Sequence, residues 1–165
     1  MEIKKVLTRE NKPTEELNEQ VEKMFKGVKL KYIEAYYLDE YVDEETGMIQ
    51  KNKKVKHYTK NQIERNLKSL KNAYHVAKGA ADPVEIIKFR EKYNIPASTF
   101  SVILGFSKNT ISNIENDGIT SLPSGRLIKM CLNNKRIMYQ YIQLCDAIDS
   151  HKKLELSKRL MGRSL

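Results

Sequence analysis

The segment from residue 94 to residue 118 restricts the fold of this chain more than any other part of the sequence. Its apolar residues follow helical spacing on both sides of Gly105, and they are Phe100, Ile103, Leu104, Ile111 and Ile114. Gly105 gives the backbone the freedom that a tight link between two helices requires. The Ser107 hydroxyl is placed to accept a hydrogen bond from an unpaired amide at the start of the second helix. The segment therefore predicts two short helices joined by a tight turn.

Two helices joined by a short, glycine-containing turn form a helix-turn-helix. The segment resembles the helix-turn-helix of the Xre/Cro class at Phe100, Leu104, Gly105, Phe106, Ser107, Thr110, Ile111, Ser112, Ile114 and Glu115, and Gly118 comes two residues later than the usual glycine. The resemblance implies that the segment binds DNA. An ordinary helical hairpin is the alternative, and it explains the apolar positions equally well. It does not explain why the outer face of the second helix is Lys, Asn, Thr and Ser, with no acidic residue before Glu115.

The resemblance implies that the second helix, predicted over residues 107–116, lies in the major groove of DNA. Asn109 and Asn113 are one helical turn apart, and a side-chain amide can donate and accept at once, as adenine requires. Ala97 occupies a place where this class often has a phosphate-binding Gln, so the following helix is expected to compensate. The candidate DNA-binding residues are Ser107, Lys108, Asn109, Thr110, Ser112, Asn113, Arg126 and Lys129.

The charge of the chain favours an anionic partner. The net charge is +9 and the pI is about 9.4, and nucleic acid is the obvious anionic partner. Residues 1–82 carry 17 basic and 14 acidic residues, a net charge of +3. Residues 83–165 carry 13 basic and 7 acidic residues, a net charge of +6. Most of the excess positive charge therefore lies in the half that contains the predicted helix-turn-helix.

A second resemblance covers residues 66–132. The residues that carry it before the helix-turn-helix are Asn66, Leu67, Leu70, Ala73, Tyr74, Lys78, Gly79, Pro83, Glu85, Ile86, Ile87, Arg90, Lys92 and Tyr93. They are similar to the region that precedes the helix-turn-helix in MqsA-type antitoxin repressors, and the resemblance implies such a role. That family usually opens with a zinc domain that has four cysteines, whereas the cysteines of this chain are Cys131 and Cys145. We therefore expect no metal and no cofactor, and Asn113, where the family often has Arg, implies a different operator.

The sequence predicts a mainly α fold with a small α+β unit at the N-terminus. Residues 1–58 form that unit, with a helix over 14–25 that Thr14 caps and a hairpin of strands over 28–42 and 48–55. Residues 59–134 form a helical linker and a five-helix Xre-type bundle. Thr59 and Gln62 make a capping box, Asp82 and Pro83 open the next helix, and a further helix covers 122–133. Residues 135–165 form a C-terminal helical extension that a break at Asp149 or Ser150 divides.

Two features outside the helix-turn-helix leave alternatives open. Tyrosines alternate with lysines between residues 29 and 58, and they either stack on nucleic acid or, as we prefer, form the apolar face of a small sheet or of a partner interface. The C-terminal extension either packs on the N-terminal unit or, as we prefer, forms a dimer seam or a groove for another protein. Its inward residues are expected to be Ile137, Tyr141, Leu144 and Ile148, with Met138 and Cys145 on an adjoining strip.

The sequence predicts a regulator and not an enzyme. His57, His75 and His151 are dispersed, and no nucleophile, phosphate-loop or metal motif is present. No apolar run is long enough for a membrane span or a secretion signal, so we expect a cytoplasmic protein with free thiols. The predicted function is a sequence-specific transcriptional repressor that binds a duplex operator as a homodimer, including the form of an antitoxin that binds a toxin and regulates its own operon. The alternative is a protein-interaction module that binds its partner through the N-terminal unit or the C-terminal helices.

Overall fold

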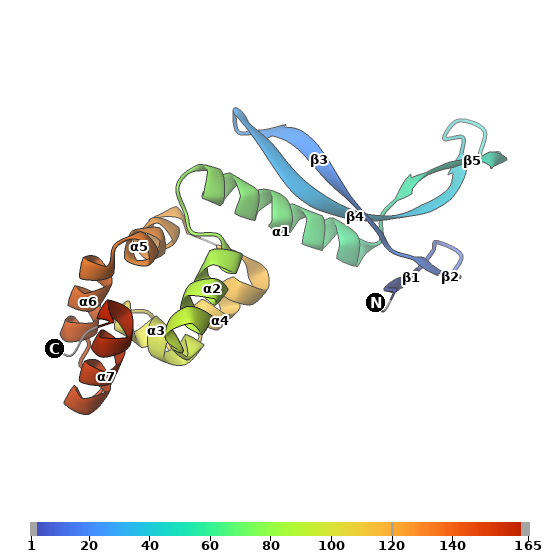
Figure 1. The fold of residues 1–165 in the computed structure, drawn as a ribbon. Helices are drawn as coiled ribbons and strands as arrows, with labels where there is room; N and C mark the ends of the chain where they lie inside the picture. The colour runs from blue at the N-terminus through green and yellow to red at the C-terminus, as the bar shows by residue number, and fades with distance from the viewer. Residues whose placement is uncertain (1–2, 120, 163–165) are drawn as a thin grey trace. The chain divides into compact units, whose positions relative to one another are not determined.

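The computed structural model describes residues 3–119 and 121–162. Within these residues the N-terminal part forms strands and the rest forms helices (Figure 1). The strands are β1 (Lys5–Leu7), β2 (Pro13–Glu15), β3 (Leu17–Phe25), β4 (Val28–Val42) and β5 (Ile49–His57). The helices are α1 (Lys60–Ala77), α2 (Pro83–Tyr93), α3 (Ala97–Ile103), α4 (Thr110–Asp117), α5 (Leu122–Asn133), α6 (Lys135–Leu144) and α7 (Ser150–Met161). The chain divides into two compact units, Met1–Ala73 and Tyr74–Leu165, called here the N-unit and the C-unit.

The fold is mixed α+β, so the prediction of a mainly α chain with a five-helix bundle is wrong. The predicted helix over residues 14–25 is instead strand: Thr14 lies in β2, and residues 17–25 form β3. The cause is the turn that follows. Lys26 and Gly27 both have positive φ, 47° and 77°, as a two-residue turn between antiparallel strands requires. Because Phe25 pairs with Val28 at this turn, β3 is held in register with β4.

The main sheet of the N-unit is antiparallel and has the order β3-β4-β5, and β1 pairs separately with β2. The long strand β4 is central, but its two neighbours pair with different parts of it. Strand β3 pairs with residues 28–36 of β4, and β5 pairs with residues 37–42. The strand predicted over 28–42 is confirmed, and the returning strand predicted over 48–55 is observed as β5. The predicted turn between them is closed by Asp43, whose Oδ1 accepts from the amides of Glu45 and Thr46.

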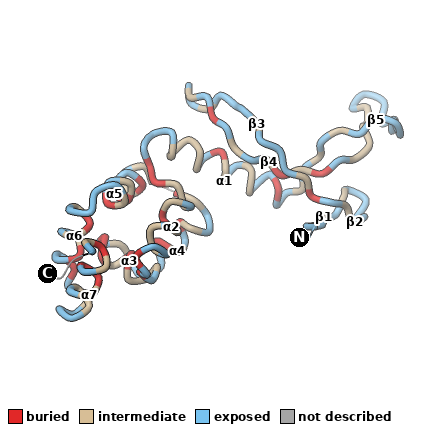
Figure 2. Tube along the Cα trace, in the orientation of Figure 1, coloured by how far each residue is buried: buried red, intermediate tan, exposed pale blue. Residues whose placement is uncertain are grey.

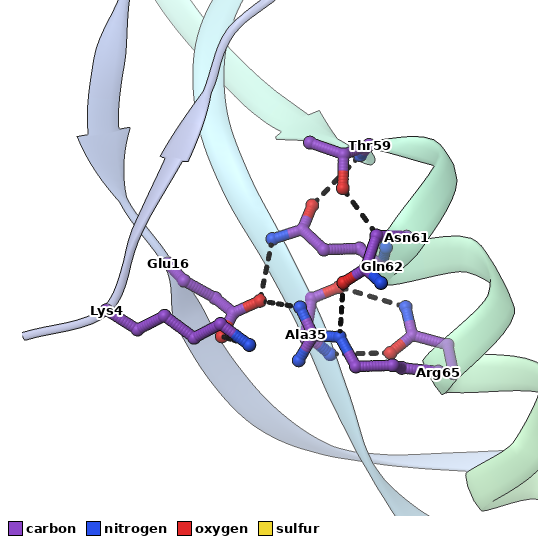
Figure 3. A network of polar contacts seen from close by, with 8 residues as sticks. Lys4, Glu16, Ala35, Thr59, Asn61, Gln62 and Arg65 are labelled. Atoms are coloured by element: carbon purple, nitrogen blue, oxygen red, sulfur yellow. Dashed lines mark hydrogen bonds and ion pairs between the residues drawn. The ribbon is translucent and has the colours of Figure 1, made fainter.

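A buried polar network joins the start of α1 to the strands of the N-unit (Figure 3). The predicted capping box is confirmed. The backbone N–H of Gln62 donates to the Thr59 hydroxyl, and the backbone N–H of Thr59 donates to the side-chain oxygen of Gln62, both at 3.0 Å. The buried Gln62 side chain also donates to Glu16 Oε1 at 3.2 Å. Arg65 forms an ion pair with the same oxygen, and Lys4 lies 3.8 Å from the other.

The C-unit is built around one hydrophobic core to which all of α2 to α7 contribute, as the buried segments in Figure 2 show. Each of α2 to α7 contributes at least one core residue with less than one per cent exposure, and these residues are Ile86, Phe100, Ile111, Ile128, Met138, Ile142 and Leu156. The last two helices are therefore part of the bundle, and the prediction of a separate C-terminal extension on a five-helix bundle is wrong. The predicted break between these helices is observed, with Asp149 capping α7.

The connection between α1 and α2 packs closely against α5. The Asp82 carboxylate accepts from the Val84 amide at 2.9 Å, which confirms the predicted start of α2. One residue earlier, the Ala81 amide donates to the Gly125 carbonyl at 3.0 Å. A Cβ atom on Gly125 would lie 2.5 Å from the Cβ of Ala80, so a glycine is needed for this approach. The contact fixes where α5 begins, next to the end of α4.

Candidate nucleic-acid interface

Helices α3 and α4 are joined by a tight turn, as predicted. Gly105 has a φ of 85°, a conformation that side chains rarely adopt. Phe100, Ile103 and Leu104 on one side of the turn are buried. Ile111 and Ile114 on the other side are buried as well. The predicted inward faces of both helices are therefore confirmed, and they fix which face of α4 points outward.

A buried serine sets the junction between α3 and α4. The Ser101 hydroxyl donates to the Ala97 carbonyl at 2.8 Å and accepts from the Ile111 amide at 3.0 Å, so it satisfies an amide in the first turn of α4. The prediction that Ser107 caps this helix through an amide is wrong. The cap residue is Asn109, and the Ser107 hydroxyl instead bonds the Thr110 hydroxyl at 2.8 Å. Sequence reasoning missed Ser101 because its partner lies ten residues away, across the turn.

An ion pair ties α4 to α2. The Arg90 Nε and Nη2 atoms donate to the two carboxylate oxygens of Glu115, at 2.5 and 2.8 Å, and Arg90 Nη1 donates to the Ile95 carbonyl at 3.1 Å. Both side chains are largely buried, with exposed fractions of 19% and 11%. A two-pronged pair of this kind fixes orientation as well as distance. Together with Ser101, it holds α4 at both of its ends.

The outward face of α4 is polar and open. Ser107, Lys108, Asn109 and Asn113 are exposed, whereas Thr110 and Ser112 are half-buried. The helix begins later than predicted, at Thr110, but the backbone N–H of Asn113 donates to the backbone carbonyl of Asn109 at 3.0 Å. The two asparagines are therefore separated by one helical turn, as the sequence predicted.

A shallow hollow lies beside this face, between the end of α4 and the start of α5. It has a volume of about 300 Å³ and is lined by Thr110, Asn113, Ile114, Asp117, Gly118, Ile119, Ser121 and Ser124. The two serines on the α5 side were not among the predicted site residues. Their position follows from the Gly125 contact, which the sequence pattern does not reveal. The hollow therefore extends the polar surface from α4 onto the first turn of α5.

Arg126 and Lys129 do not line the hollow, although they lie on the same helix as Ser124. Arg126 Nε donates to the Lys78 carbonyl at 2.9 Å, near the end of α1. Lys129 Nζ lies 2.8 and 2.6 Å from the two carboxylate oxygens of Glu85 in α2. The structure thus brings together the predicted residues of the turn and α4. The two predicted residues of α5 bond instead to Lys78 and Glu85. Both side chains keep further N–H donors, because a guanidinium has five and an ammonium three.

The sequence predictions also concern metal binding, the thiols and membrane spans. No group of three or more His, Cys, Asp and Glu side chains in residues 3–119 and 121–162 is arranged to hold a metal ion. Cys131 and Cys145 are free and buried, and burial raises the pKa of the Cys131 thiol to about 11. Within the same residues, no helix has the length and apolar character needed to cross a membrane.

Comparison with protein-family models, with curated proteins and with solved structures found no match to this chain. The resemblance to Xre/Cro-type and MqsA-type proteins therefore stays a prediction from the residues quoted above. What the structure adds is the geometry of α4: a helix fixed from behind by buried contacts, with polar side chains on its open face.

Proposed function

We propose that this protein is a sequence-specific DNA-binding regulator, most simply a repressor, and that α4 enters the major groove. One observation carries the proposal: α4 is held rigidly by Ser101 and by the Arg90–Glu115 pair, while Asn109 and Asn113 stay exposed. A rigidly held helix with free amides is what direct reading of base edges requires. The excess positive charge of the C-terminal half supports an anionic partner.

The major groove can admit α4. An α-helix with its side chains is about 10–12 Å across, and the major groove of DNA is about 12 Å wide. An asparagine that faces adenine can donate to N7 and accept from the N6 amino group, so each amide distinguishes one base. Lys108, beside the amides, is placed for a phosphate contact, which positions the helix without specifying sequence. The Ser112 hydroxyl donates to the Asn109 carbonyl at 3.2 Å, so it would have to turn away from that carbonyl to reach a phosphate.

A single helix of this size makes a small interface, so we propose that the protein binds as a homodimer. The expected operator is then a palindrome whose half-sites are about 34 Å apart, one turn of DNA. Repression of its own operon as the antitoxin of a toxin–antitoxin pair is the more specific form of this proposal. The resemblance over residues 66–132 supports it. The protein would act in the cytoplasm, where the thiols of Cys131 and Cys145 stay reduced.

The test begins with selection of bound duplexes from a random pool by the full chain. The proposal predicts a palindromic consensus. Asn109→Ala and Asn113→Ala should each weaken binding of that duplex by about 1–3 kcal/mol, because an amide that reads a base is lost. Gln140→Ala removes an exposed amide from α6 and serves as the matched control, with unchanged affinity. Equal affinities for the parent and both asparagine variants would overturn the proposed placement of α4.

A second candidate function has its own supporting observation. The N-unit leaves Ile63 and Leu67 of α1 about half exposed, at 55% and 46%. The apolar side of this helix is therefore only partly covered, because Leu70 is buried and these two residues are not. Exposed apolar residues beside a sheet favour a protein-interaction module in the N-unit. This function is compatible with DNA binding by the C-unit.

A further inference from the structure

The central strand of the N-unit sheet has an open edge. Strand β3 pairs with residues 28–36 of β4 on one side, but on the other side β5 pairs with residues 37–42 and no further. Within the described residues, no strand pairs with this second side of residues 29–33. The pairing alternates, so Lys29, Lys31 and Ile33 direct their backbone N–H and C=O groups to the open side. They oppose Met24, Glu22 and Gln20 of β3 in non-hydrogen-bonded pairs.

A side-chain amide marks the place where pairing along this edge stops. Ala35 has the same orientation as Ile33, and both of its backbone groups are bonded by Asn66 of α1. The Ala35 amide donates to Asn66 Oδ1 at 2.8 Å, and Asn66 Nδ2 donates to the Ala35 carbonyl at 2.9 Å. The Asn66 side chain thus takes the place of one residue of an adjacent strand. The edge is therefore satisfied at Ala35 and still available from Ile33 to Lys29.

The open edge adjoins an apolar groove. A hollow of about 220 Å³ lies between the sheet and α1, and it is lined by Lys23, Tyr32, Glu34, Tyr58, Ile63, Asn66, Leu67 and Leu70. Glu34 is engaged within the groove, because the Tyr58 hydroxyl donates to its Oε1 at 2.6 Å. Ile63 and Leu67 remain about half exposed there. A strand added to the edge would place every second side chain in this groove.

The other face of the same edge is basic. Lys29 and Lys31 follow each other on the face of the sheet opposite the groove, together with the exposed Ile33. Glu22 forms an ion pair with Lys29 at 2.5 Å, so this carboxylate does not compensate the charge of Lys31. Side chains of an added strand that face this side would therefore gain from being acidic. Lysines on an edge also discourage indiscriminate pairing, but that role does not explain the exposed apolar residues in the groove.

We propose that residues 29–33 of β4 bind an extended segment of a partner protein in which apolar and acidic residues alternate. The segment adds as a strand: its backbone pairs with Lys29, Lys31 and Ile33, its apolar side chains enter the groove, and its acidic side chains face the lysines. The same edge of a second copy is a poor occupant. Antiparallel self-pairing centred on Lys31 places this lysine against its own copy, and like charges directly opposite each other are unfavourable. The proposal concerns the N-unit and does not rest on DNA binding by the C-unit.

The test measures binding of a fluorescently labelled peptide of alternating valine and glutamate to the full chain, by anisotropy. The proposal predicts saturable binding that Ile33→Pro weakens by about tenfold, because proline removes an N–H group that faces the open edge. Ile33 does not bond β3 through this group, so the ladder with β3 is kept. Gln20→Pro is the matched control, because it removes the equivalent N–H from the outer edge of β3. Its affinity for the peptide should equal that of the parent.

Further variants examine the two faces separately. Lys31→Glu should weaken the valine–glutamate peptide and improve binding of a valine–lysine peptide, and Leu67→Asp should weaken both. If Ile33→Pro disturbs folding, as judged by amide NMR spectra, the same question is put to the parent with a peptide N-methylated at alternate residues, which should bind at least about tenfold more weakly. Undetectable binding of the valine–glutamate peptide to the parent overturns the proposal, as does equal binding by Ile33→Pro and the parent. Dimerisation of the parent that Ile33→Pro abolishes in sedimentation would also overturn it, in favour of a second copy as the occupant.

Discussion

The N-unit and the C-unit reach a defined structure by different means. In the C-unit a continuous cluster of buried apolar residues joins α2 to α7, and the polar contacts around α4 add orientation to a helix that packing already holds. In the N-unit the buried apolar residues are few among those described: Leu30, Ala35, Tyr37 and Leu70. Its strands and α1 are joined instead by the network around Glu16 and by the Asn66 amide. Apolar packing dominates the C-unit, and hydrogen bonds and ion pairs dominate the N-unit.

This difference indicates what each unit leaves free for a partner. A unit with one continuous core offers the polar side chains left on its surface, as α4 does with Asn109 and Asn113. A sheet with little core offers backbone groups and apolar side chains, as β4 and α1 do. We therefore expect base recognition from the C-unit and strand addition to the N-unit. The predictions below address this contrast in order of decreasing effect.

The largest effect is expected from the centre of the C-unit core. Phe100 is fully buried at 0% exposure, and its ring stacks on that of Phe89 with centroids 5.7 Å apart. Phe100→Ala should lower the free energy of unfolding of the C-unit by about 3–5 kcal/mol, measured by urea denaturation. The control Met130→Ala, at a 56% exposed position, should change it by less than about 0.5 kcal/mol. A small effect of Phe100→Ala would contradict a unit stabilised mainly by packing.

A smaller effect is expected where α5 meets the connection before α2. The added Cβ of Gly125→Ala would meet Ala80 at 2.5 Å and Ile119 at 2.9 Å, and neither neighbour belongs to a long, flexible side chain. We expect a loss of about 1–3 kcal/mol in thermal or urea unfolding. Gly162→Ala is a useful comparison, because it has a φ of 65° and open space around it and so isolates backbone strain from crowding. Full stability of Gly125→Ala would show that the two segments separate easily.

The N-unit should respond to acid through Glu16. Burial alone would raise the pKa of this carboxyl, but hydrogen bonds from Arg65 and Gln62 and the charges of Arg65 and Lys4 outweigh burial and hold the pKa below its usual value. A depressed pKa means that the stabilisation is complete above the unfolded value of about 4.3 and is lost as the pH falls through the folded value. Amide NMR signals of β4 and α1 should therefore weaken as the pH falls below about 4.3, toward the folded pKa of Glu16. In Glu16→Gln this part of the pH dependence should vanish, and its persistence would exclude Glu16 as the cause.

The smallest effect concerns a thiol of the C-unit core. Cys131 is buried, and burial raises its pKa to about 11. We expect iodoacetamide to leave Cys131 unmodified in the folded protein at neutral pH, because the thiol is neither ionised nor accessible. Mass spectrometry after reaction with and without urea gives the comparison. Rapid modification without urea would indicate that the C-unit opens more readily than its packing suggests.

Local sequence signals predicted some elements well, because those signals act within a few residues. The strand over 28–42 follows from its β-branched and aromatic residues and from the turn after it, and the caps at Thr59 and Asp82 follow from hydrogen bonds to residues nearby. The same local patterns misassigned residues 14–25. Leu17, Val21 and Phe25 recur every four residues, which suits a helix face and one face of a strand equally well.

The remaining errors of prediction concern contacts between residues that are distant in the sequence. The inward strip predicted for the helix after residue 135 included Leu144, which is 79% exposed. The buried residues there are Met138 and Cys145, which were predicted on the adjoining strip, and Ile142, which was not predicted. Two residues that hold α4, Ser101 and Arg90, were not predicted as part of the site. Their roles depend on the amide of Ile111 and on the carboxylate of Glu115, which the fold brings to them. The exposed face of α4 was predictable because its apolar residues define the opposite face.

The central claim is that DNA binds to α4 of the C-unit and not to the lysines of β5 in the N-unit. The most direct measurement is a titration of the isotope-labelled full chain with the selected duplex, followed by amide NMR. We predict that signals of residues 107–113 and 121–124 shift or broaden first, while those of Lys51, Lys53 and Lys54 in β5 stay unchanged. Changes confined to β5, or a spectrum in which the signals of α4 do not respond to saturating duplex, would contradict the account.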